Sequence, residues 1–177
     1  MTDTDFSFDN NLYICKVTAD KKKCPTYLRS IPAVAQLFDR GIGFKKRITV
    51  FMGENGIGKS TLLEAIAAAY GFNPEGGTRN FSFSTYNSHS ELYGALKLSR
   101  GGYPKDGFFL RAESFYNVAS EIERLDNIPA ASPPIIDGYG GVSLHEQSHG
   151  ESFMALAMNR FRGHGLYILC LLYTSPS

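Results

Sequence analysis

The sequence lacks the features that would place it in several large protein classes. Its N-terminus carries no signal-peptide pattern, and its longest apolar run, Leu166 to Tyr173, is far too short to span a bilayer. With 18 basic and 17 acidic residues, its net charge of +1 gives no argument for nucleic acid or an anionic membrane as a partner. The three cysteines show no metal-ligand spacing and fit free thiols in a reducing cytosol. We therefore expect a cytoplasmic globular protein.

Glycine, in contrast, is present, and three glycines lie close together in residues 53–60. Residues 53–60 fit G-x-x-x-x-G-K-[ST], the phosphate-binding P-loop. Ile48 to Met52 is apolar and β-branched, which predicts a buried strand running into the loop. Thr61 to Tyr70 is rich in helix formers, which predicts a helix leaving it. This context predicts a nucleotide-binding site formed by Gly53, Glu54, Asn55, Gly56, Ile57, Gly58, Lys59, Ser60 and Thr61.

The chemistry of a triphosphate explains why these residue types occur together. Backbone N–H groups of the loop wrap the anion, and the helix N-terminus adds partial positive charge. Glycine allows the backbone to approach closely and to take conformations that a Cβ forbids. We expect Lys59 to reach the β- and γ-phosphates and to act as the catalytic cation. The Ser60 hydroxyl is expected to ligate Mg²⁺.

Strands and helices alternate along the rest of the chain. Such alternation predicts an α/β fold with a largely parallel sheet. Further strands are expected at 12–18, 91–99, 108–111 and 166–169, and further helices at 32–38, 115–125 and 151–162.

A second motif lies 89 positions after Lys59 (148 − 59 = 89), where a polar stretch opens the predicted helix at 151–162. It reads Gln147, Ser148, His149, Gly150 and Glu151. This stretch resembles the signature motif of ABC-type ATPases, usually written L-S-G-G-Q, although it keeps only Ser148 and Gly150 of the core. A polar helix cap without a ligand is the alternative interpretation.

The P-loop wording from Asn55 to Leu63 is also similar to that superfamily. More narrowly, the chain resembles the soluble ABC-like ATPases of the AAA-type predicted ATPase families, relatives of the RecF and SMC heads, from about Tyr13 to Leu169. The resemblance implies a P-loop NTPase with ABC-type topology that binds ATP and Mg²⁺. It also implies a homodimer, in which the signature residues Ser148, His149, Gly150 and Glu151 close on the γ-phosphate held by the other subunit. Glu113 lies near the position of the family's Q-loop glutamine, although an exposed carboxylate there is equally expected.

The chain departs from the family pattern at the predicted strand 166–169, which occupies the place of the Walker B strand. An Asp and a Glu should follow it, to hold the Mg²⁺ shell and to orient the attacking water. Cys170 and Leu171 follow instead. Residues 170–177 resemble translated sequencing-adapter sequence. We therefore interpret residues 1–169 as a partial ABC-type ATPase domain, incomplete at its C-terminus, and residues 170–177 as a non-native tail.

Three functions fit these observations. The first is ATP hydrolysis by the full-length protein, with little or no activity in this chain. The second is a nucleotide-binding module that does not hydrolyse ATP, because the Walker B acids are absent. The third is a P-loop kinase of small molecules, which predicts transfer to an acceptor and no role for Ser148.

Overall fold

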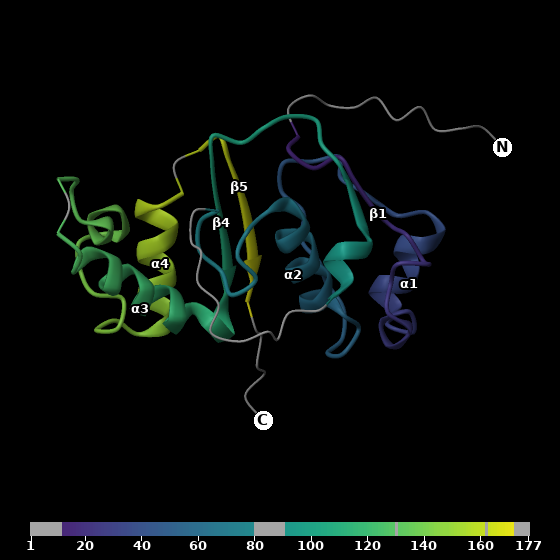
Figure 1. The fold of residues 1–177 in the computed structure, drawn as a ribbon, viewed down its shortest axis with the longest axis horizontal. Helices are drawn as coiled ribbons and strands as arrows, with labels where there is room; N and C mark the ends of the chain where they lie inside the picture. The colour runs from purple at the N-terminus through teal and green to yellow at the C-terminus, as the bar shows by residue number, and fades with distance from the viewer. Residues whose placement is uncertain (1–11, 80–90, 130, 162, 172–177) are drawn as a thin grey trace. The chain divides into compact units, whose positions relative to one another are not determined.

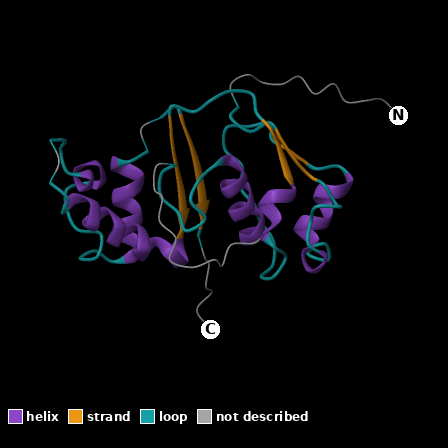
Figure 2. Cartoon of the chain, in the orientation of Figure 1, coloured by secondary structure: helices purple, strands orange, loops and turns teal. Residues whose placement is uncertain are grey.

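The computed structural model describes residues 12–79, 91–129, 131–161 and 163–171 (Figure 1). Helices and strands both occur, as Figure 2 shows, so the predicted α/β class is confirmed. The described residues form two compact units. The first contains residues 12–70 and 91–104, and the second contains residues 71–79, 105–129, 131–161 and 163–171. The P-loop lies in the first unit and the candidate signature motif in the second.

The first unit is built on a small antiparallel sheet. Strand β1 (Lys16–Ala19) lies between β2 (Ile42–Gly43) and β3 (Leu96–Ser99), and Val17 is opposite both Ile42 and Leu98. The helical segments of this unit are η1 (Thr26–Leu28), α1 (Pro32–Asp39), α2 (Lys59–Tyr70) and η2 (Glu91–Ala95). Their apolar faces meet in one core, which includes Leu28, Val34, Ala65 and Leu92. Helix α2 therefore has a packed face that fixes the residues at its start.

The predicted strand before the P-loop is wrong. Residues 48–52 belong to no strand among the described residues, and Ile48, Val50 and Met52 are 83%, 73% and 87% exposed. β-branched composition favours a strand only where a neighbouring strand and an apolar cover are present. In the first unit, the described strands pair only with one another and leave this segment without a partner.

Two further predictions for this unit need correction. The predicted strand 91–99 is a strand only in its second half, because residues Glu91–Ala95 form the 3-10 helix η2. The predicted strand 12–18 begins later, at Lys16. The predicted helix 32–38 is confirmed as α1, with Pro32 in the first turn, where its missing N–H costs no hydrogen bond.

The second unit is built on a parallel strand pair. β4 (Asp106–Arg111) pairs with β5 (Gly165–Cys170) along its whole length, from Asp106 opposite Gly165 to Arg111 opposite Cys170. The helical segments are η3 (Ala112–Ser114), α3 (Phe115–Asp126), η4 (Ile135–Tyr139) and α4 (His149–Asn159). Helices α3 and α4 bury Val118, Ile122 and Leu156 against Phe108 and Leu110 of β4. The predicted strands 108–111 and 166–169 and the predicted helix 115–125 are thus confirmed. The predicted helix 151–162 is confirmed as α4, which begins two residues earlier, at His149, and already ends at Asn159.

The expectation of a largely parallel sheet holds only in the second unit, since all pairs described in the first unit are antiparallel. None of the helices in the described ranges has the length and apolar character needed to cross a bilayer.

Candidate functional site

The P-loop takes the backbone conformation that its glycines permit. Gly53, Gly56 and Gly58 have φ angles of 150°, 83° and 98°, all in the region that side chains disfavour. At Gly58 the requirement is doubled, because an added Cβ would lie 2.3 Å from Cγ2 of Ile31. The loop therefore packs closely on the residue that precedes α1.

The start of α1 braces the loop from one side. The N–H of Ala33, in the first turn of α1, donates a hydrogen bond of 3.1 Å to the carbonyl of Ile57. Together with the close approach of Gly58 to Ile31, this contact fixes the end of the loop directly before α2. The end of the loop is thus held by Ile31 and by the first turn of α1.

Helix α2 begins at Lys59, and its first turn contains no acidic residue. Its first backbone hydrogen bond runs from the N–H of Leu62 to the carbonyl of Gly58 (3.0 Å). The N–H groups of residues 59–61 precede that bond and have no acceptor within the helix. Such a terminus attracts an anion through its free donors and its dipole.

The ammonium group of Lys59 lies over the loop. Its Nζ donates to the carbonyls of Gly53 (2.7 Å) and Glu54 (2.8 Å). The two contacts hold a cation against the backbone at the start of the loop. The structure thus brings the predicted residues Gly53 to Thr61 together, in the loop and the first turn of α2.

The residues present fit a bound magnesium nucleotide. No group of three or more His, Cys, Asp and Glu side chains placed to hold a metal occurs in the described ranges. Mg²⁺ does not need one at such a site, because phosphate oxygens and water supply most of its ligands. The Ser60 hydroxyl, which forms no hydrogen bond to another described residue, is the protein oxygen that would bind the ion.

The candidate signature motif forms the N-terminus of α4. Ser148 is the N-cap, and its hydroxyl accepts a hydrogen bond from the N–H of Glu151 (3.3 Å). The Glu151 carboxylate in turn accepts from the N–H (2.9 Å) and the hydroxyl (2.6 Å) of Ser148, which completes a capping box. These hydrogen bonds lower the pKa of Glu151 below its usual range. His149 begins the helix, but its side chain lies outside the described part of the structure.

Glu113 lies in η3, directly after β4. Its side chain is 49% exposed and forms an ion pair of 2.7 Å with Arg111. The contact is local, because the two residues are two positions apart. This geometry fits an exposed carboxylate without a catalytic role as well as it fits the Q-loop position that the resemblance implies.

A serine, a histidine and a glutamate also meet in the second unit, where the sequence offered no signal. Ser120 Oγ lies 3.1 Å from Nε2 of His145, and Glu123 Oε2 lies 3.9 Å from the same nitrogen. A nucleophilic triad requires the acid and the serine on different ring nitrogens. With both on Nε2, this cluster instead holds the segment before α4 against α3, helped by the packing of His145 on the Tyr116 ring at 4.3 Å.

Comparison with known proteins decides the family. A family model described as an AAA domain matches residues 30–122, just over half of the chain. The chain belongs to this family. AAA domains of this kind are P-loop ATPases related to SMC and RecF proteins, and they generally use ATP with Mg²⁺. No curated protein and no solved structure matches the chain. The match to the AAA domain includes the P-loop and β4 and ends in α3, before Ser148.

Proposed function

We propose that this AAA domain binds ATP with Mg²⁺ at residues 53–61 and, in the full-length protein, hydrolyses it as an ABC-type ATPase. The observation that carries the proposal is the geometry of the P-loop. Three glycines with positive φ lead into a helix whose N-terminus has no carboxylate in its first turn, and Lys59 lies over the same loop. Each of these features favours a polyphosphate, and together they leave little other use for the loop.

In this proposal, Lys59 stabilises the charge that develops on the transferred phosphoryl group. Phosphoryl transfer depends on positioning and electrostatics more than on covalent chemistry. The loop carbonyls that now accept from Lys59 would keep the ammonium in place while it contacts the anion. Ser60 would contribute one oxygen to the Mg²⁺ shell.

We further propose a dimer in which the signature residues of each subunit close on the nucleotide of the other. Gly150 supports it, because an added Cβ there would meet no described atom within 4 Å. The open space at this position leaves room for another molecule to approach the backbone of the first turn of α4, which a glycine permits. Binding would require Ser148 to exchange its 2.6 Å contact with Glu151 for a phosphate oxygen of the partner's nucleotide.

Nucleotide binding without hydrolysis is the alternative, and the sequence of β5 favours it. The strand ends in Leu169 and Cys170, and Leu171 follows, so neither a Mg²⁺-shell aspartate nor a catalytic glutamate occupies this position. In the hydrolytic proposal, Glu113, which lies in η3 directly after the neighbouring strand β4, takes the part of the family's Q-loop glutamine.

Turnover distinguishes the two functions. In the full-length protein, release of phosphate from Mg-ATP that Lys59→Ala abolishes, while the exposed-lysine control Lys97→Ala retains it, would establish hydrolysis. Binding of Mg-ATP without phosphate release would establish the binding module. Phosphate transfer to a small acceptor, unaffected by Ser148→Arg, would replace both with the small-molecule kinase.

The dimer is tested separately, in the full-length protein. Ser148→Arg places a long cation in the proposed clamp and should prevent ATP-dependent dimerisation, measured by light scattering, while leaving ATP binding to the monomer unchanged. Dimerisation that persists in this variant would contradict the ABC-type arrangement.

A further inference from the structure

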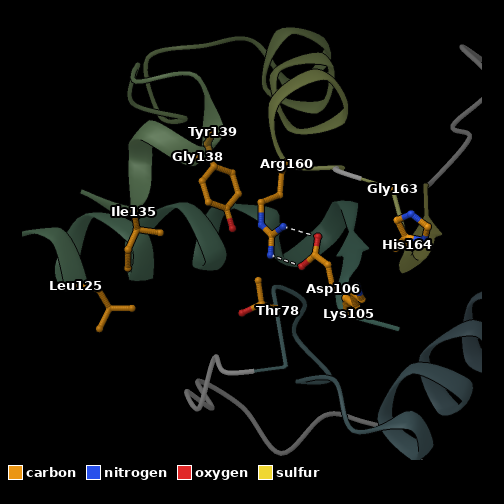
Figure 3. Close-up of a pocket in the computed structure, with 10 residues that line it drawn as sticks. All are labelled: Thr78, Lys105, Asp106, Leu125, Ile135, Gly138, Tyr139, Arg160, Gly163 and His164. Atoms are coloured by element: carbon orange, nitrogen blue, oxygen red, sulfur yellow. Dashed lines mark hydrogen bonds and ion pairs between the residues drawn. The ribbon is translucent and has the colours of Figure 1, made fainter. Parts of the chain in front are cut away.

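The second unit contains a cavity at the amino ends of its two parallel strands. Its volume is about 620 Å³, within the range of about 300–1,000 Å³ that is usual for small-molecule sites. Residues from both strand starts, from α3, from η4 and from the end of α4 line it (Figure 3). We call it the amino-end cavity. Its main lining residues are Lys105, Leu125, Ile135, Tyr139, Arg160 and His164.

An ion pair forms one wall of the amino-end cavity. Arg160 donates to both carboxylate oxygens of Asp106, at 2.6 and 2.8 Å, and the Tyr167 hydroxyl donates to the same carboxylate at 3.0 Å. Burial alone would raise the pKa of Asp106, but Arg160 and the other donors outweigh it and hold that pKa below its usual range. The pair is therefore ionised on both sides and contributes no net charge to the cavity.

Lys105 supplies the charge that remains. It precedes β4 and forms no ion pair with a described carboxylate, and its N–H donates to the carbonyl of His164 at 3.0 Å. This hydrogen bond joins the starts of the two strands. His164 has a φ of 51°, a conformation that is uncommon outside glycine. The amino-end cavity thus has a net positive charge at the side where the two strands begin.

The opposite side of the amino-end cavity is apolar. Figure 3 shows Leu125 and Ile135 on one side and Lys105 with His164 on the other. Tyr139 lies between them and is 2% exposed. Burial raises the pKa of Tyr139, so its hydroxyl stays protonated and remains a hydrogen-bond donor at neutral pH.

We propose that the amino-end cavity binds a small organic anion that has an apolar body and one acidic group. The apolar body would lie against Leu125 and Ile135, and the acidic group would face Lys105 and His164. The separation of apolar and cationic sides favours such an amphipathic ligand over an inorganic anion, which would leave the apolar side without a contact.

This site is separate from the proposed nucleotide site. β4 and β5 are each six residues long, so their carboxyl ends, which lead to Glu113 and Leu171, lie about 17 Å away from the cavity. The P-loop belongs to the first unit and contributes no residue to the lining. Ligand binding in the amino-end cavity is therefore expected to be independent of ATP binding.

Naphthoate is a suitable probe, with naphthamide as a neutral control of the same shape. Titration of each into the protein, followed by two-dimensional amide NMR, should shift the resonances of residues 105, 139 and 164. Naphthoate should bind about three to five times more tightly than naphthamide, because one partly solvated ion pair distinguishes the two. Lys105→Gln should remove this preference, whereas Lys97→Gln, on β3 of the first unit, should retain it.

A second variant tests the apolar side. Ile135→Ser should weaken both probes by a similar factor and leave their ratio unchanged. Equal affinities of the two probes for the unmodified protein would overturn the proposal. So would shifts outside the amino-end cavity, or a preference that persists in Lys105→Gln. Lys59→Ala should have no effect on either probe, which separates this result from the outcome for ATP.

Discussion

The sequence predicts a phosphate contact at two helix N-termini, those of α2 and α4. The two differ in whether an acidic side chain of the helix itself already lies there. Helix α2 follows three glycines of positive φ, has no acidic residue in its first turn and has Lys59 beside it. Helix α4 begins with a complete capping box, in which the Glu151 carboxylate accepts from the N–H and the hydroxyl of Ser148, and the Ser148 hydroxyl accepts from the N–H of Glu151. One terminus therefore attracts an anion, while the other already contains one.

This difference indicates that the N-terminus of α4 mainly stabilises its helix and that the N-terminus of α2 is the better place for an anion. A carboxylate at a helix N-terminus satisfies the free N–H groups and the dipole, so it stabilises the helix and opposes a second anion. A bare N-terminus contributes less to folding and more to binding. We infer that α2 binds phosphate within one chain, and that α4 contacts nucleotide only if a partner's site displaces the Ser148–Glu151 interaction.

The largest expected effect comes from adding a methyl group to the loop before α2. Gly58→Ala should weaken Mg-ATP binding by about 100-fold, because the Cβ meets both an unfavourable φ of 98° and the Ile31 side chain. Gly56→Ala has a φ of 83° but no described atom within 4 Å, so its loss should be about tenfold or less. Calorimetric titration measures both, and equal losses would show that packing on Ile31 is unimportant.

An intermediate effect is expected at the other end of α4, where Arg160 is tied to Asp106. Their side chains are 18% and 24% exposed, and Asp106→Asn should lower the free energy of unfolding by about 1–2 kcal/mol at neutral pH. Urea unfolding measures the difference against Asp137→Asn, an exposed control in the same unit. A loss no larger than that of the control would contradict the proposed anchoring of α4.

The same pair predicts a pH dependence. The folded-state pKa of Asp106 is lower than its unfolded value, so its contribution is fully present above the unfolded pKa of about 3.9. It is lost as the pH falls through the folded pKa. The stability difference between the wild type and Asp106→Asn should therefore shrink only in strongly acidic solution. A difference that disappears near neutral pH would point to a cause other than this carboxylate.

The smallest expected effect separates the two termini directly. Ser148→Ala should lower the free energy of unfolding by about 0.5–1 kcal/mol, because it removes the cap of α4, and should leave ATP binding to the monomer unchanged. Ser60→Ala should do the reverse, weakening binding of Mg-ATP more than of ATP alone with little effect on stability. Chemical unfolding measures the stability of each variant, and calorimetry measures its affinity for Mg-ATP. If both variants lost the same property, the distinction between the two helix N-termini would be wrong.

Local patterns in the sequence predicted much of this structure. The P-loop, the helices at 32–38 and 115–125 and the strands 108–111 and 166–169 were predicted, because residue spacing within one segment decides them. The sequence also offered a polar helix cap at residues 147–151 as an alternative, and in the structure this cap is the capping box of Ser148 and Glu151. What the spacing did not decide was whether that pair serves the helix or a ligand.

Features that depend on distant partners were not predictable. Residues 48–52 have the composition of a strand, but pairing with a neighbouring strand decides whether they form one. Asp106 and Arg160 are 54 positions apart, and neither belongs to a motif. The antiparallel pairing of β1 with β2 and β3 also joins segments whose patterns do not specify the direction of their partners. The amino-end cavity was not predictable either, because the pairing of β4 with β5 brings its lining residues together from distant parts of the chain.

The most direct test of the central claim is a titration of the monomeric protein with Mg²⁺ and a non-hydrolysable ATP analogue, followed by amide NMR. We predict that the resonances of residues 53–61 shift at the lowest analogue concentrations and that those of residues 148–152 stay unchanged. Early shifts at the start of α4, or none in the P-loop, would contradict the assignment of phosphate binding to α2.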